Sequence, residues 1–243
     1  SLVGRMGEEA GQPGSLHFAA AHADKFAFAV VGEPTNLETV YAHKGCVWLE
    51  LSAGGRSCHG STPQLGDNAI RKLSRILEDL ILELEETLDS YADKTLGKPT
   101  VSLGQIEGGT SPNIVPSSCR ATLDFRETPA LHAAGGSYSL VTKILQERQL
   151  EDEIRVRIIG DSVPLLVAPE TDGIKKLQSI GSKLETAPWF CDAGRLAEEG
   201  LPAVACGPGN IAQAHTKDEF LTIADLEAGV AFYKRFLEPY RPK

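Results

Sequence analysis

The fold is decided by a stretch that opens with Val47-Trp48-Leu49-Glu50-Leu51, whose side chains alternate in the manner of a β-strand. A period of two is typical of a strand with one buried face. Asp67 then stands as the N-cap of a predicted helix. The apolar residues of that helix recur at helical spacing and form one face: Ile70, Leu73, Ile76, Leu77, Leu80, Ile81 and Leu84.

Four more elements follow this strand and helix. They are strands at 100–106, 114–126 and 154–159, and a helix at 137–149. The turn-rich Gly108-Gly109-Thr110-Ser111-Pro112 separates the first two of these strands. The order β-α-β-β-α-β over residues 46–160 predicts a ferredoxin-like module.

The residues on either side of this module follow a different pattern. Residues 26–31 form an apolar run typical of a buried parallel strand, and Glu33 follows at its carboxyl end, where α/β proteins commonly place functional groups. The later elements are a helix near 170–184, an apolar strand at 201–206 and a final helix near 223–237. We therefore expect an α/β chain in which a doubly wound domain, residues 1–45 and 161–243, is interrupted by the module at 46–160.

Composition excludes some classes of partner. The 243 residues carry a formal net charge of −9, which argues against nucleic acid or an anionic membrane. No apolar run approaches the roughly 20 residues of a membrane span, and the N-terminus does not resemble a signal peptide. The cysteines are odd in number and scattered, without a Cys-x-x-Cys pair: Cys46, Cys58, Cys119, Cys191 and Cys206. These features predict a cytoplasmic protein with reduced thiols.

The candidate chemistry lies in a few acids and one histidine. Glu8 and Glu9 are adjacent, Glu33 follows the first predicted strand, and His215 lies near the far end of the chain. Carboxylates and an imidazole form an oxygen and nitrogen site suited to Zn²⁺ or a similar divalent ion. Of two neighbouring acids, one can bind metal while the other acts as a base toward a water molecule.

Several short motifs, taken in order, resemble the M20 family of metallopeptidases and aminoacylases. The likeness is greatest to the branch of acetylornithine deacetylases and succinyl-diaminopimelate desuccinylases, and it spans essentially the whole chain. The matching motifs are Glu8-Glu9-Ala10-Gly11, Val31-Gly32-Glu33-Pro34-Thr35, Ala42-His43-Lys44-Gly45, His59-Gly60-Ser61-Thr62-Pro63, Asn113-Ile114-Val115-Pro116, Leu123-Asp124-Phe125-Arg126, Cys191-Asp192-Ala193 and Gly207-Pro208-Gly209 with His215-Thr216. The resemblance implies a catalytic domain interrupted by a ferredoxin-like lid that also forms a homodimer.

The resemblance also implies roles for the acids and the histidine. Glu8 would be the general base and acid, Glu9 and His215 would bind one metal, and Glu33 would bind the other. A complete site in the family holds two ions, Zn²⁺ or in their place Co²⁺ or Mn²⁺. The implied substrate is a small N-acyl amino acid such as acetylornithine.

Other residues would contribute to binding and to the transition state. By the resemblance, a histidine matching His59 reaches from the partner subunit's lid to stabilise the oxyanion. Asn113 and Arg126 would hold the substrate carboxylate, and Asp192 with Gly207-Pro208-Gly209 would shape the floor of the pocket.

Two motifs of the family have no counterpart in the expected place. Its His-x-Asp ligand motif and its metal-bridging Asp lie upstream of the acid pair and do not fit before Ser1. His22-Ala23-Asp24 has the residue types and spacing of the first motif, but it follows the acid pair. We therefore expect an N-terminally incomplete catalytic domain that binds one metal ion or none. The alternatives are an inactive fragment that serves only as a dimerising or binding module, and a desuccinylase or dipeptidase of the same family.

Overall fold

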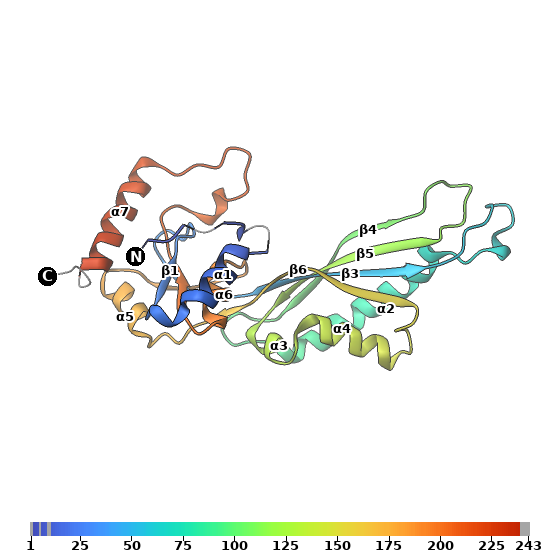
Figure 1. The fold of residues 1–243 in the computed structure, drawn as a ribbon, viewed down its shortest axis with the longest axis horizontal. Helices are drawn as coiled ribbons and strands as arrows, with labels where there is room; N and C mark the ends of the chain where they lie inside the picture. Colours follow the sequence, from blue (N-terminus) through green and yellow to red (C-terminus); the bar gives the residue numbers. More distant parts are fainter. Residues whose placement is uncertain (1, 5, 9–10, 239–243) are drawn as a thin grey trace. The chain divides into compact units, whose positions relative to one another are not determined.

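The computed structural model describes residues 2–4, 6–8 and 11–238. These residues form two compact units (Figure 1). Residues 1–44 and 162–243 make up the first, here called the mixed-sheet unit. Residues 45–161 make up the second, here called the ferredoxin-like unit.

The ferredoxin-like unit has the element order that the sequence predicts. Its strands are β3 (Gly45–Gly54), β4 (Thr100–Gly108), β5 (Ser118–Glu127) and β6 (Ile154–Ser162), and its main helices are α2 (Ala69–Leu88) and α4 (Gly136–Glu147), with the short α3 (Pro129–Ala133) before α4. The strands lie in the order β4-β5-β3-β6, and both β4 and β3 run antiparallel to β5. This order is that of a ferredoxin-like sheet, so the predicted fold is confirmed.

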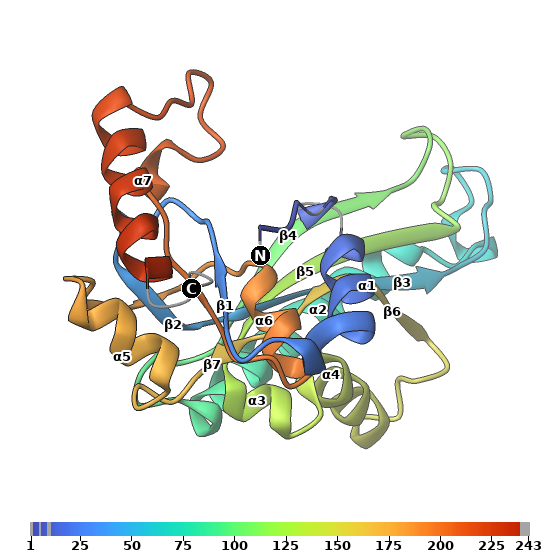
Figure 2. The ribbon, with the colours of Figure 1, turned by 60° about the vertical axis from the view of Figure 1, so that its left-hand side comes forward.

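The core of this unit follows from the two periodicities in its sequence. Every second residue of β3 is buried, from Val47 to Ala53. These side chains pack against the buried stripe of α2, which includes Leu73 and Leu84. Figure 2 shows α2 and α4 on the same face of the sheet. Burying each leucine completely contributes about 1.5–3 kcal/mol to the stability of the unit.

Two predicted boundaries in this unit are wrong. Asn68, not Asp67, is the N-cap of α2, because the Asn68 side chain accepts a hydrogen bond from the backbone N–H of Arg71. Asp67 instead forms an ion pair with Lys72. Strand β5 begins at Ser118 rather than at 114, because the preceding residues pair with the loop that contains His59.

The mixed-sheet unit is built around a five-stranded sheet. Its strands are β1 (Ala29–Val31), β2 (Thr39–His43), β7 (Leu165–Leu166), β8 (Leu184–Ala187) and β9 (Ala203–Ala205), and its helices are α1 (Pro13–His22), α5 (Asp172–Ser179), α6 (Asp192–Glu198) and α7 (Ile223–Leu237). The order is β1-β9-β2-β7, with β8 also paired to β2. Strand β1 is parallel to β9, and β2 is parallel to β8 but antiparallel to β7.

The sequence predicted the final helix and the parallel strand before Glu33, but it misjudged one region. The helix predicted near 170–184 ends at Ser179, and residues 184–187 form strand β8. Gly181 has a φ of +105°, a left-handed conformation that ends a helix and that glycine adopts without strain. In the described residues, no helix combines the length and apolar character needed to cross a bilayer.

Candidate active site

Two turns of the mixed-sheet unit meet at the carboxyl ends of β1 and β9. The first contains Glu33 and Thr35, and the second is Gly207-Pro208-Gly209. The backbone N–H of Thr35 donates to the carbonyl of Gly207 at 3.1 Å, and the Gly207 N–H donates back to Oγ1 of Thr35 at 3.1 Å. Asn36 N–H donates to the Gly209 carbonyl at 2.6 Å. These bonds hold Glu33 at the carboxyl edge of the sheet, where ligands of α/β proteins bind.

Three carboxylates act electrostatically on one buried thiol in this unit. Cys191, immediately before α6, is 1% exposed. Burial raises its pKa well above the ordinary value, and the negative charges of Glu33, Glu8 and Asp192 raise the pKa further. The three acids come from different parts of the chain, yet all lie close enough to act electrostatically on the same sulfur atom. We call Glu8, Glu33 and Asp192 the carboxylate cluster.

His215 lies on an exposed loop of the same unit. Its φ is +60°, and its backbone N–H donates to Oε2 of Glu219 at 3.0 Å. Glu9, the other proposed ligand of the same metal ion, lies outside the described residues. Within residues 2–4, 6–8 and 11–238, no three His, Cys, Asp or Glu side chains are placed to share a metal ion. The described residues therefore supply donors of a suitable chemical type but do not fit a complete metal site.

In the ferredoxin-like unit, the loops that carry His59 and Asn113 are joined. Gly60 N–H donates to the Asn113 carbonyl at 2.7 Å, and His59 pairs with Ile114 in a β-bridge. A Cβ at position 60 would lie 3.0 Å from that carbonyl oxygen, so this approach favours glycine. The two loops are thus held together at the tip of the unit.

Local hydrogen bonds determine which atoms these side chains present. The backbone N–H of Ser61 donates to Nδ1 of His59 at 3.2 Å, so Nδ1 is an acceptor and a neutral ring carries its proton on Nε2. The Ser111 hydroxyl donates to Oδ1 of Asn113, which leaves the amide nitrogen of Asn113 as its donor. Both residues can therefore donate hydrogen bonds to an anionic oxygen.

Arg126 lies at the opposite end of the same sheet. Its Nε and one terminal nitrogen donate to the two carboxylate oxygens of Asp124 at 2.8 and 3.0 Å, and Trp48 donates to one of those oxygens at 3.0 Å. Arg126 lies eight positions along β5 from Ser118, where the strand meets the loop of Asn113. That length of strand is about 26 Å. Within one chain, Arg126 therefore does not reach the same small ligand as His59 and Asn113.

Several supporting residues stand in the quoted motifs but were given no role from the sequence. Thr35 joins the two turns, Ser61 sets the protonated nitrogen of His59, and Asp124 holds Arg126. Only the last had a readable signal. In Asp124-Phe125-Arg126 the two charged residues stand two positions apart on a strand and so share one face of the sheet.

The chain is similar to several known proteins. Residues 41–151 match the family model described as "Peptidase dimerisation domain". Over 238 residues the chain is 29% identical to an acetylornithine deacetylase of Vibrio cholerae, covering 96% of this chain and 63% of the relative. By these matches the chain is similar to the M20 family of peptidases. It is also 31% identical to a probable carboxypeptidase of Talaromyces marneffei, over 86% of this chain and 48% of that protein.

The fold of an M20 enzyme is likewise similar. An M20 family metallo-carboxypeptidase from Sulfolobus solfataricus superposes with a TM-score of 0.70 at 20% identity, over 96% of this chain and 68% of that one. The chain spans about three fifths of the length of the Vibrio relative. The predicted resemblance to the M20 family is confirmed.

Proposed function

We propose that this chain forms part of a metal-dependent amidohydrolase that cleaves the N-acyl amide of a small amino acid, with acetylornithine-like substrates favoured. One observation supports the proposal: the carboxylate cluster has Glu8, Glu33 and Asp192, from three parts of the chain, within electrostatic range of one buried thiol, and Glu33 follows the carboxyl end of β1. The Vibrio relative, named acetylornithine deacetylase, supports the choice of substrate.

Glu8 is the proposed general base and acid. Amide hydrolysis requires that a proton be taken from the attacking water and later delivered to the leaving amine, and a half-buried carboxylate can do both. Glu9, Glu33 and His215 are the proposed metal ligands. A metal ion, when bound, supplies a water molecule whose pKa is lowered to about 7.

His59 is the proposed donor to the oxyanion. We assign Asn113 to the oxyanion as well, in place of its predicted role at the substrate carboxylate, because its loop is joined to the loop of His59. Their Nε2–H and amide N–H groups are held in place before substrate arrives, as stabilisation of a developing charge requires. Arg126 is proposed to bind the substrate carboxylate. Because Arg126 and His59 lie at opposite ends of one sheet, each copy would serve two sites, with His59 and Asn113 supplied by the partner.

A homodimer would meet this requirement. Among the described strands, β4 pairs with β5 alone, so its other edge is open. On this edge strand Leu103 is 41% and Ile106 48% exposed, and the adjacent helix α2 exposes Leu82. We propose that a second copy covers this edge and thereby forms a symmetric dimer.

The catalytic proposal is tested with Glu8→Gln, which keeps the size of the side chain and removes the base. The protein is loaded with Zn²⁺, Co²⁺ or Mn²⁺ and assayed on N-acetylornithine, N-succinyl-diaminopimelate and a dipeptide. We expect the acetyl substrate to be cleaved fastest and Glu8→Gln to abolish turnover while metal content stays near that of the wild type. Glu33→Gln should lower metal content and activity together, and equal activity in all variants would refute the roles proposed here.

The second candidate function is that of a dimerising module without catalysis. It is favoured by the match of residues 41–151 to a dimerisation domain and by the lack of a three-ligand metal cluster among the described residues. Elemental analysis helps to separate the two candidates. We expect one divalent ion per chain or none, and two tightly held ions would exclude the non-catalytic candidate.

A further inference from the structure

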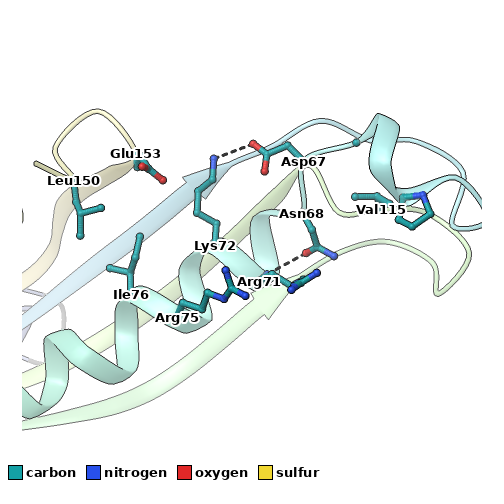
Figure 3. A pocket seen from close by; sticks show the side chains of 11 residues that line it. Asp67, Asn68, Arg71, Lys72, Arg75, Ile76, Val115, Leu150 and Glu153 are labelled. Carbon is teal, nitrogen blue, oxygen red and sulfur yellow. Dashed lines mark hydrogen bonds and ion pairs between the residues drawn. The ribbon is translucent and has the colours of Figure 1, made fainter.

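A pocket of about 540 Å³ lies beside the first turns of α2, and every residue that lines it belongs to the ferredoxin-like unit (Figure 3). Its volume falls within the roughly 300–1,000 Å³ of small-molecule sites. Arg71, Lys72 and Arg75 contribute its positive charge, and Ile76 and Leu150 are among its apolar lining residues. None of the residues proposed above for catalysis lines this pocket.

Carboxylates neutralise only some of the positive charges of this pocket. Lys72 is neutralised by Asp67, whose carboxylate lies 2.9 Å from Nζ, as Figure 3 shows. Across the parts of the chain that the structure describes, neither Arg71 nor Arg75 has an ion-pair partner within 4.0 Å. Glu153, the other carboxylate of the lining, offsets only part of this excess.

Without a bound anion, the positions of these two arginines destabilise helix α2. Arg71 and Arg75 stand four residues apart on α2 and so repel each other across one turn. Both lie in the first two turns, where the helix dipole disfavours positive charge. A bound anion would reverse both effects, because it would lie between the two guanidinium groups and neutralise them.

We propose that this pocket binds the phosphate group of a small organic phosphate ester. Two planar guanidinium groups can each hold a pair of phosphate oxygens, and a doubly charged phosphate matches both of them. A single carboxylate would neutralise only one arginine. The apolar side chains of Ile76, Val115 and Leu150 would contact the organic part of the ligand.

Titration calorimetry in a phosphate-free buffer tests this site with three probes. They are adenosine monophosphate, inorganic phosphate and adenosine. We expect adenosine monophosphate to bind at least tenfold more tightly than inorganic phosphate, because only the ester contacts the apolar wall, and adenosine to bind negligibly. Adenosine binding as tightly as its phosphate, or no binding of either phosphate at millimolar concentration, would overturn the proposal.

Variants locate the binding within the pocket. Arg71→Gln and Arg75→Gln should each weaken binding of adenosine monophosphate about tenfold or more, whereas Glu153→Gln should tighten it severalfold. Lys94→Gln is the matched control, because Lys94 is exposed and lies beyond the C-terminal end of α2. That end of the helix is about 25 Å from Arg71. Equal weakening by Lys94→Gln would mean a general charge effect and would refute the site. All four side chains are solvent-exposed, and circular dichroism verifies that each variant is folded.

Discussion

Gly207 lies so close to Glu33 that a Cβ at position 207 would stand 2.6 Å from the Glu33 carbonyl oxygen. The contact joins the turn after β9 to the turn after β1. Packing of the two turns therefore fixes the backbone of a proposed metal ligand. Only glycine allows this approach without a shift of one turn.

Gly207→Ala should therefore destabilise the mixed-sheet unit by about 1–3 kcal/mol, the usual cost of overpacking. Urea unfolding monitored by tryptophan fluorescence measures this change, since Trp189 lies in this unit. Gly4→Ala is the control, because a Cβ at position 4 would have no neighbour within 4 Å. An equal loss of stability in both variants would contradict the packing argument.

A buried histidine predicts how stability depends on pH. His43 is 0% exposed, its Nδ1 donates to the Lys44 carbonyl at 2.9 Å, and its Nε2 has no hydrogen-bond partner among the described residues. Burial lowers the pKa of His43 from 6.5 to about 4, because desolvation disfavours the charged ring. The unfolded chain consequently binds a proton at a higher pH than the folded chain does.

The contribution of His43 to stability should be constant above pH 6.5 and should fall as the pH drops from 6.5 toward 4. The loss across this window should be about 3 kcal/mol, following the shift in pKa. Urea unfolding at a series of pH values measures it. His43→Gln should make the curve flatter in this window, and an unchanged slope would show that other groups account for the acid sensitivity.

The proposed dimer can be tested on the edge strand β4. Ile106→Lys should weaken dimerisation by at least tenfold, because it places a charge on an apolar surface that a second copy would bury. Sedimentation velocity over a range of concentrations measures the monomer fraction. Ile158→Lys, on the opposite edge strand, is the control with a similar exposed fraction of 46%. A monomeric wild-type protein at micromolar concentration would exclude the dimer.

The separation of His59 from Arg126 predicts complementation between chains. His59→Ala should lower turnover about 10²–10³-fold without changing metal content, since it removes one donor to the oxyanion. When Glu8→Gln and His59→Ala chains are mixed, one of the two sites in each heterodimer regains both wild-type groups. Activity should then return to a measurable fraction of the wild type. Subunits that exchange freely and regain no activity would refute the role of His59 across the dimer.

Much of the ferredoxin-like unit could be read from the sequence, because its elements repeat with a period of two or 3.6 residues. The alternation from Val47 and the apolar stripe from Leu73 predicted β3 and α2 from neighbouring residues alone. The first residue of each element was harder to predict from the sequence. Asp67 and Asn68 are both good N-cap residues, and only the hydrogen bond to Arg71 shows which of them caps the helix.

The sequence likewise predicted one part of the candidate site, and only the tertiary structure decided the other. The order of short motifs was sufficient to single out Glu8 and Glu33, and it also singled out His59, Asn113 and Arg126. That Glu8 and Glu33 act on the same buried thiol of Cys191, and that Arg126 lies a full strand length from Asn113, came from the tertiary structure. The physical reason is the range of the interactions: helix and strand periodicity depends on residues a few positions apart, whereas the site depends on pairing between β1 and β9, more than 170 residues apart along the chain.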